Sequence, residues 1–557
     1  MIAKKAKSKT RRWRINLVLF FLLAACAGVV GRLFYLQIVL GERYQVLAQG
    51  FEVFARDNQD ISRGEIFFAG GQPLAINKDF FYCYASPMKI NDKEQAVRTV
   101  AQILGLEEQS LRDKFQKESL YAFIKEKLGD AEIEALERAA IEGIYVKKKK
   151  MRYYPQGEVG GQLAGFVDDD GVGRYGLEDY YNDKLSAGES IFLNIDHNLQ
   201  YQAQRLIAQA KEDLNAVSGE AIVANPKTGA ILAMAETPNF DPNDYKKVAK
   251  DGIEILKNDS CQTLFEPGSV FKAITMASAL NEKKVTPETD YIDSGMVKIG
   301  GWPIYNYGHR AYGRQTMTNV LEHSVNTGVV FAQSRLGDGP FVEYLEKFGI
   351  FEPTGIDLPE TFSDNAEFKK GYAINYATAS FGQGIWMTSI QLIRAYSALA
   401  NGGVLVRPSV AKIKQEETPP ARQVIDPETS KTIAKMLASV VDNGFGKSAK
   451  IKGYSIAGKT GTAQMSWSTL DINERGYSDK TTQSFIGFFP AEDPQFLILV
   501  KLVAPEANTA EYSSLPVFKE LAQYAIYLSQ IPPSEKSDDT AVPAEMETAQ
   551  TQPHSGD

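Results

Sequence analysis

An apolar run near the N-terminus constrains this chain more than any other feature. Between Ile15 and Gly31, Asn16 is the only strongly polar side chain, and a helix of this length just crosses the hydrocarbon core of a bilayer. Seven Lys or Arg residues and no acid precede the run, whereas only Arg32 and Arg43 flank its other end. Because basic flanks stay on the cytoplasmic side, we expect a single-pass plasma-membrane protein. Its N-terminus is expected in the cytoplasm and its body, from about residue 40, outside the cell membrane.

A second interpretation of the apolar run concerns Cys26. The sequence Leu23-Ala24-Ala25-Cys26 resembles a bacterial lipoprotein cleavage box, which would make Cys26 a lipidated N-terminus. Lipoproteins usually continue with a polar tether, but here "AGVVGRLFYLQIVL" continues the helix. We therefore favour an uncleaved anchor over lipidation or cleavage; both interpretations leave the body tethered outside.

Composition narrows the class of protein. With 557 residues and 44% hydrophobic side chains, the chain can form two to four domains, each with its own core. Its three cysteines are too few for a disulfide framework. Four histidines without an H-E-x-x-H or C-x-x-C motif give little support to a metal site, and we expect no metal and no cofactor. The basic N-terminal arm leads straight into the apolar run, which favours a membrane over a nucleic acid as its partner.

The organisation of the chain changes at about residue 190. Residues 41–190 mix short strand-like runs with one charged amphipathic stretch, "DKEQAVRTVAQILGLEEQSLRDKF", and carry no evident catalytic constellation. Beyond it come longer helical patterns and two strand hairpins, "EAIVANPKTGAILAMAE" and "QSFIGFFPAEDPQFLILVKLV". The last 27 residues, rich in Pro, Ser, Thr and acids, predict a disordered tail.

The stretch "GYSIAGKTGTAQ" fits two chemistries. From Gly453 it matches the P-loop pattern G-x-x-x-x-G-K-[ST], and from Lys459 it reads K-T-G-T, an element of penicillin-recognising serine acyltransferases. A P-loop needs a buried strand before its first glycine and a helix after the Lys-Thr pair. The residues before Gly453 are small and cationic, and Gly461 disfavours a helix after Thr460. We therefore expect a strand here and keep a P-loop NTPase as the alternative.

An acyltransferase also needs a nucleophile, and Ser269-Val270-Phe271-Lys272 supplies the pattern S-x-x-K. A second copy, Ser86 to Lys89, shows that the pattern alone is weak. Only Ser269 follows Pro-Gly and opens a helical run, so Lys272 falls in the first turn, one turn from the hydroxyl. There the helix dipole and a dry site would lower its pKa and allow it to act as a base. The alternative is a solvated lysine at a helix end.

A third element is Ser324-Val325-Asn326 in "NVLEHSVNTGVVFAQ". From a turn between two helices, Ser324 and Asn326 could present a hydroxyl and a carboxamide to one cleft. Taken alone, S-x-N is most often a helix cap. His323 is adjacent, but neighbouring side chains point apart, so we interpret it as structural.

The order and spacing of Ser269, Ser324 and Lys459 make these weak signals strong together. With "SRGEIFFAGG", "RYYPQGEVGG" to "GLEDYY", "FEPGSVFK", "HSVNTG", "AGKTGTAQ" and "SFIGFFPAEDP", nearly the whole chain resembles the class B penicillin-binding proteins. Within that family it is most similar to the monofunctional D,D-transpeptidases of the cell-division (septal) type. Three positions depart from the usual pattern: Phe68-Ala69 in the first box, Val325 in the S-x-N motif, and "EYSSLPVF" near the C-terminus.

The resemblance implies an α+β fold with a single N-terminal transmembrane helix, an elongated mixed pedestal and a penicillin-binding transpeptidase domain. The last has a central antiparallel sheet flanked by helices. The corresponding domains are 1–14 (cytoplasmic basic tail), 15–37 (transmembrane anchor), 38–190 (pedestal, dimerisation type), 191–530 (transpeptidase) and 531–557 (disordered acidic tail).

The resemblance also implies a mechanism. Lys272 would activate Ser269 to attack a peptidoglycan stem peptide ending in D-Ala-D-Ala, with Ser324 relaying a proton and Asn326 orienting the peptide. Lys459, with Thr460, Gly461 and Thr462, would receive the terminal carboxylate. β-Lactams, a SEDS-type glycosyltransferase and other divisome membrane proteins are the implied partners. The alternatives are an elongation-type class B transpeptidase, a carboxypeptidase or β-lactamase, and a catalytically inactive divisome scaffold.

Overall fold

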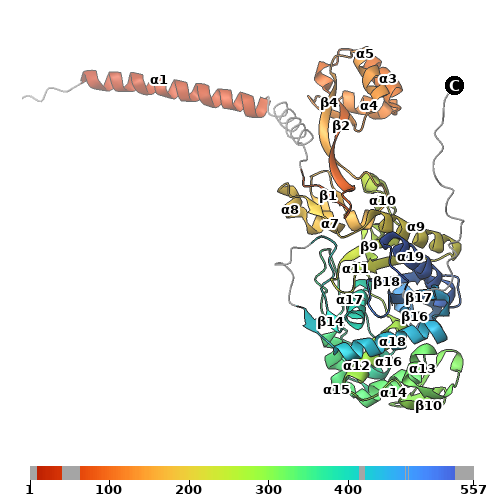
Figure 1. Cartoon of the computed structure of the whole chain (residues 1–557). Coiled ribbons are helices and arrows are strands. Elements are labelled where there is room, and N and C mark those ends of the chain that lie inside the picture. Colours follow the sequence, from red (N-terminus) through yellow and green to blue (C-terminus); the bar gives the residue numbers. More distant parts are fainter. Residues whose placement is uncertain (1–8, 40–62, 413–420, 471, 475, 534–557) are drawn as a thin grey trace, which may run out of the picture. The chain divides into compact units, whose positions relative to one another are not determined.

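The computed structural model describes residues 9–39, 63–412, 421–470, 472–474 and 476–533 (Figure 1). Two compact units divide the chain: residues 1–62 with 77–152, and residues 63–76 with 153–557. The first residues of the expected cytoplasmic tail, the start of the expected pedestal and most of the expected acidic tail lie outside the described residues.

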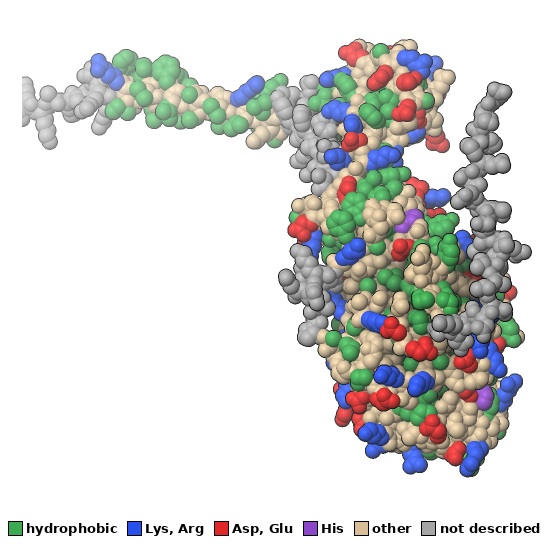
Figure 2. Space-filling model, in the orientation of Figure 1, with side chains coloured by type: hydrophobic (Ala, Val, Ile, Leu, Met, Phe, Trp, Pro, Cys, Tyr) green, Lys and Arg blue, Asp and Glu red, His purple; other side chains and the backbone are tan. Residues whose placement is uncertain are grey.

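Helix α1 (Lys9–Phe34), followed by a short π-helix at Tyr35–Val39, contains the predicted anchor. Trp13–Val39 has a mean hydropathy of 2.4, and in the described part of the chain it is the one helix long and apolar enough to cross a membrane. Figure 2 shows hydrophobic side chains along its surface, with basic side chains toward both ends. An apolar surface of this kind is stable in lipid rather than in water.

The smaller unit contains a sheet covered by three helices. Strand β2 (Pro73–Ala85), which belongs to this unit from Asn77 onward, pairs with β3 (Ala122–Lys125) and with β4 (Ile144–Tyr153), whose last residue belongs to the larger unit. The amphipathic stretch forms two helices, α3 (Lys93–Leu104) and α4 (Glu108–Phe115), where the sequence pattern suggested one. Gly105 ends α3 in a left-handed conformation (φ 65°), which a glycine adopts at no steric cost. Helix α5 (Asp130–Ala139) completes the cover.

The larger unit begins with a small subregion in which two of the quoted motifs meet. Arg63, from "SRGEIFF", forms a buried ion pair with Glu178, from "GLEDYY", at 3.0 Å, and Tyr154 donates to the same carboxylate at 3.3 Å. Phe68, one of the departures from the family pattern, is buried with its ring 5.2 Å from that of His197. The departure at Phe68 therefore places an aromatic side chain in a buried position, in contact with the His197 ring. The elements here are β1 (Ile66–Phe67), α6 (Gly161–Ala164), β5 (Phe166–Val167), β6 (Gly173–Arg174), α7 (Gly176–Tyr180), α8 (Asn182–Ser186) and β7 (Ile191–Phe192).

A five-stranded sheet forms the centre of the larger unit. Its order is β16-β17-β18-β8-β9, and every neighbouring pair is antiparallel. The two predicted hairpins are β8–β9 and β17–β18, which confirms them. Strand β16, which carries Lys-Thr-Gly, is the last strand on one side of this order. The bounds are β8 (Ser218–Ala224), β9 (Ile231–Thr237), β16 (Ala457–Ser466), β17 (Tyr477–Phe489) and β18 (Phe496–Val503).

Helices cover both faces of this sheet, as a strand with apolar residues on both sides requires. Along β17, Phe485 and Phe489 pack with α19 (Ser514–Ser529) and α9 (His197–Asp213) in one core. Ile486 and Phe488 point the other way, into the core built around α12 (Lys272–Asn281). The other elements on that side include α11 (Asp259–Gln262), α13 (Met317–Glu322), α14 (Asn326–Leu336), α15 (Asp338–Lys347), α16 (Ala373–Ala379), α17 (Ser389–Ala400) and α18 (Pro427–Asn443), with the short hairpin β11 (Met296–Ile299) and β12 (Trp302–Tyr305).

Candidate active site

The predicted nucleophile lies on a tight turn that leads into α12. Gly268–Phe271 is a short 3₁₀ turn, and α12 begins at Lys272. Gly268 has a φ of +61°, and a Cβ there would lie 2.9 Å from the Cβ of Ala463, so a glycine is required. This close approach brings the Ser269 turn against strand β16.

Lys272 is fully buried and reaches across to the second motif. Its Nζ donates to the Ser324 backbone carbonyl at 2.5 Å and contacts Ser324 Oγ at 3.0 Å. Burial, followed by repulsion from the charge of Lys459, holds the pKa of Lys272 well below its usual value. Among the described residues, no hydrogen bond joins Ser269 Oγ to Lys272. In this structure the Lys272 amine is hydrogen-bonded to Ser324 instead.

Ser324 lies in the predicted turn between α13 and α14, and Asn326 is the first residue of α14. Ser324 adopts a left-handed φ of 54°, which is uncommon for a residue with a side chain. Backbone strain of this kind persists only where the surroundings enforce it. Asn326 Nδ2 donates to the Tyr305 carbonyl at 2.9 Å, so the amide is held by strand β12.

Lys459 lies inside strand β16, paired with Ile486 of β17, and no helix begins there. The phosphate-loop interpretation therefore has no structural basis. The side chain is fully buried, and its Nζ lies 3.1 Å from Ser324 Oγ and 3.2 Å from the Thr460 carbonyl. Burial lowers the pKa of Lys459 to about 7. The amines of Lys272 and Lys459 thus converge on one hydroxyl.

Gly461 and Thr462, also predicted from strand β16, are fixed by their neighbours. A Cβ on Gly461 would lie 2.5 Å from Ser484 Oγ, so this position has no room for a side chain. Thr462 accepts a hydrogen bond from the Ala510 backbone at 3.3 Å, which ties the strand to the loop after β18.

These residues open onto one cleft of about 1380 Å³, lined by Ser269, Ser324, Asn326, Thr460 and Thr462. A cleft of this size accommodates a peptide-sized ligand. The structure therefore brings together the side chains that the three motifs predicted, although they come from segments more than fifty residues apart in the sequence.

The sequence motifs did not predict two of the walls of the cleft. One is formed by Tyr305, Tyr307, His309, Arg310 and Tyr312, and the other by residues 504–512. The first lies in "YNYGHRAYG", whose density of aromatic residues and glycines was a signal that could have been used. The second has no comparable pattern.

His323 also lines the cleft, yet its contacts agree with a structural role. Its Nδ1 lies 2.8 Å from Gln315 Oε1. Its ring stacks on Tyr312 with the two planes 5° apart.

The competing S-x-x-K copy lies elsewhere. Ser86 is buried in the smaller unit, and Lys89 ends a short 3₁₀ helix there. Of the cysteines in the described residues, Cys83 and Cys261 are buried and free, one in each unit.

Comparison with known proteins assigns the family. Residues 219–523 match the model of the penicillin binding protein transpeptidase domain, and residues 59–224 match the penicillin-binding protein dimerisation domain. The chain belongs to the class B penicillin-binding proteins. The two matches together span residues 59–523, and the α+β class agrees with the described architecture.

Curated relatives and solved structures support the assignment over most of the chain. Stage V sporulation protein D of Bacillus subtilis is 31% identical and is matched over 90% of this chain and 83% of its own length. The probable peptidoglycan D,D-transpeptidase PbpC of Pseudomonas aeruginosa is also 31% identical, over 96% and 98%. The penicillin-binding protein 3 of Mycobacterium tuberculosis, solved with aztreonam, aligns with a TM-score of 0.67 at 25% identity, covering 86% of this chain and 98% of that one.

Proposed function

We propose that this class B D,D-transpeptidase cross-links peptidoglycan stem peptides through an acyl intermediate on Ser269. One observation carries the proposal: the amines of Lys272 and Lys459 meet at the Ser324 hydroxyl in the cleft that Ser269 lines. A buried amine with a lowered pKa can be neutral at physiological pH and so accept a proton. The family assignment supports the same reaction class.

The first half-reaction uses the nucleophile and its base. Lys272 takes the hydroxyl proton as Ser269 Oγ attacks the carbonyl carbon of the penultimate D-Ala, and the peptide C–N bond then breaks. Ser324 passes the proton to the leaving amine of the terminal D-Ala. Backbone N–H groups of Ser269 and Thr462 hold the negative charge on the carbonyl oxygen, a contribution of about 3 kcal/mol for each donor.

Substrate is held by the residues around Lys459. The ammonium of Lys459 attracts the terminal carboxylate, and the hydroxyls of Thr460 and Thr462 donate to it. Because β16 is the last strand of the sheet among the described residues, its outer edge can pair with an extended peptide in the manner of an added strand. Asn326 then donates to the peptide backbone.

The second half-reaction decides between a cross-linking enzyme and a hydrolase. An amine from a neighbouring stem peptide attacks the Ser269 ester, forms a new amide and releases the serine hydroxyl. Water in place of the amine would make the protein a carboxypeptidase. A D,D-transpeptidase name is carried by relatives such as PbpC and the Escherichia coli FtsI, which is 28% identical over 89% of this chain. Their names support cross-linking.

Location and cellular role form part of the proposal. Seven bases before the apolar run and two after it favour a cytoplasmic N-terminus and an extracytoplasmic cleft. Relatives named for FtsI favour septal synthesis, with a SEDS-type glycosyltransferase and other divisome membrane proteins as partners. An elongation role is the alternative. A strain depleted of the protein would fail to divide under the first role and would lose its rod or cell shape under the second.

The acyl-serine step is tested by intact-mass spectrometry of the detergent-solubilised full chain with and without benzylpenicillin. We expect one covalent adduct on the wild type and on Ser86→Ala, which removes the unused S-x-x-K serine, and none on Ser269→Ala. An adduct that persists on Ser269→Ala would refute the assignment of the nucleophile. An adduct that clears within seconds would favour a hydrolase, and a wild type without an adduct would favour the inactive scaffold.

A further inference from the structure

A buried carboxylate lies three residues before Ser269 and has no role in the mechanism above. Glu266 is 7% exposed, and its Oε1 accepts the Gly384 N–H at 2.5 Å and the Tyr477 hydroxyl at 2.9 Å. The two donors lie 118 and 211 residues away along the chain. One side chain therefore joins the nucleophile turn to two distant segments.

Both of those segments form walls of the catalytic cleft. Phe381 and Gln383, just before Gly384, line it on one side, and Asp479 and Lys480, just after Tyr477, line it on another. A displacement of either segment changes the walls around Ser269 directly.

The nucleophile turn and the 380–384 segment also touch through their backbones. Gly268 donates its N–H to the Gly382 carbonyl at 3.0 Å, and a Cβ on Gly382 would lie 2.2 Å from the Gly268 carbonyl oxygen. Phe265 and Met387 exchange two backbone hydrogen bonds, of 2.9 and 3.1 Å. This contact leaves no space for adjustment, so the position of one segment sets that of the other.

In the part of the chain that the structure describes, no backbone hydrogen bond joins strand β17 to the turn. Tyr477 stands at its start, where the pairing with β16 is irregular between Gln464 and Ser466. The hydrogen bond from the Tyr477 hydroxyl to Glu266 therefore links the start of β17 to the turn, at a place where the ladder with β16 is irregular. A hydrogen bond to a carboxylate is stronger and shorter than one between neutral groups.

We propose that Glu266 is a positioning residue: its bonds to Gly384 and Tyr477 hold the Ser269 hydroxyl and backbone N–H in line with strand β16. The proposal rests on Ser269 being the nucleophile. Positioning acts on the rate of bond formation, because misplacement of a reacting group by about 1 Å can cost about 100-fold in rate. It should leave the initial, non-covalent binding of the ligand nearly unchanged.

A matched control exists in the same unit. Asp357 is also buried, accepts the backbone N–H groups of Val410 at 2.6 Å and Ala411 at 2.7 Å, and accepts the Tyr181 hydroxyl at 2.8 Å. None of these residues lines the cleft. Asp357 thus accepts the same kinds of hydrogen bonds as Glu266, from backbone N–H groups and a tyrosine hydroxyl, but these bonds lie away from the cleft.

The experiment measures acylation of the full chain by benzylpenicillin under stopped flow, separating the acylation rate constant from the dissociation constant of the first complex. Glu266→Ala should lower the rate constant by about 100-fold and Tyr477→Phe by about 10-fold, with dissociation constants within about threefold of wild type. Glu266→Gln keeps an acceptor oxygen and should restore most of the rate. Melting temperatures are recorded for every variant.

The control variants separate positioning from general stability. Asp357→Asn and Tyr181→Phe should lower the melting temperature and leave the acylation rate constant of the folded protein unchanged. Wild-type rates in Glu266→Ala or Tyr477→Phe would overturn the proposal, as would an equal loss of rate in Asp357→Asn. If Glu266→Ala fails to fold, Tyr477→Phe still decides. A wild-type chain that benzylpenicillin does not acylate would instead refute the proposed function.

Discussion

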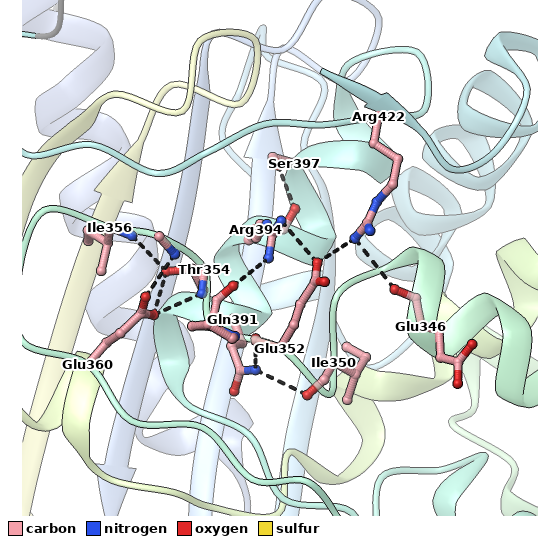
Figure 3. Close-up of polar contacts among 12 residues, drawn as sticks. Glu346, Ile350, Glu352, Thr354, Ile356, Glu360, Gln391, Arg394, Ser397 and Arg422 are labelled. Atoms are coloured by element: carbon pink, nitrogen blue, oxygen red, sulfur yellow. Dashed lines mark hydrogen bonds and ion pairs between the residues drawn. The ribbon is translucent and has the colours of Figure 1, made fainter. Parts of the chain in front are cut away.

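Two groups of basic side chains in the larger unit differ in whether a carboxylate compensates their positive charge. In the active site, Lys272 and Lys459 are fully buried and meet at a neutral hydroxyl, Ser324 Oγ. In the second group, Arg394 and Arg422 both contact Glu352 Oε1, at 3.3 and 2.6 Å (Figure 3). That group lies beside a surface cavity of about 470 Å³.

This difference in compensation distinguishes a group that serves catalysis from a group that serves stability. A buried ammonium without a carboxylate loses hydration and gains no ion pair, so burial lowers the pKa of both lysines. The protein gains a base and an anion site, at a cost in stability. Around Glu352 the carboxylate compensates the charges, and its partial exposure keeps any gain small. We therefore expect changes in the first group to act on rate, and changes in the second to act weakly on stability.

Replacing Lys272 should give the largest effect. Lys272→Met removes the base and should slow acylation by benzylpenicillin by about 10⁴-fold, the upper range for a general base. The melting temperature should not fall, because methionine fills a similar volume without a buried charge. Time-resolved mass spectrometry and calorimetry measure the two quantities. Acylation at the wild-type rate would remove Lys272 from the mechanism.

A third buried lysine offers an intermediate case. Lys501 is buried like the catalytic pair, but its Nζ lies 3.2 Å from Glu220 Oε1 and 4.3 Å from the centre of the Phe265 ring. Glu220→Gln should lower the free energy of unfolding by about 3 kcal/mol, because it leaves an uncompensated charge in the core. Acylation by the folded fraction should persist.

The paired change supplies the control for that prediction. Glu220→Leu with Lys501→Met removes both charges and should recover most of the lost stability in denaturant titrations. A double variant as unstable as Glu220→Gln would show that packing, rather than charge, dominates this site.

The pH dependence of acylation tests the role of Lys459. Its pKa of about 7 means that the free protein loses this positive charge as the pH rises through neutrality. A neutral amine no longer attracts the benzylpenicillin carboxylate, so the second-order rate constant should fall above about pH 7. Lys459→Met should be slower at every pH and should lack this alkaline decline. A wild-type profile that stays flat from pH 6 to 9 would contradict the proposal.

The sequence predicted the reacting groups because each lies in a short local pattern. Ser269 and Lys272 are one helical turn apart, and the glycines around Lys459 indicate a strand open to a ligand. Glu266 accepts hydrogen bonds from Gly384 and Tyr477, which lie 118 and 211 positions away in the sequence. No local pattern encodes contacts over such separations. The left-handed backbone of Ser324 was not predicted either, since no local sequence pattern there indicates a positive φ.

The smallest effect is expected at Glu352. Glu352→Gln removes the negative charge between Arg394 and Arg422, but the loop stays anchored because Gln391 Nε2 donates to the Ile350 and Glu352 carbonyls at 3.1 and 2.9 Å (Figure 3). Partly exposed ion pairs contribute about 1 kcal/mol or less. Denaturant titration should therefore show a loss within that range, reduced further by added salt, with acylation unchanged. A loss as large as that of Glu220→Gln would mean that Glu352 is effectively buried in solution, and the contrast between the two groups of charges would then fail.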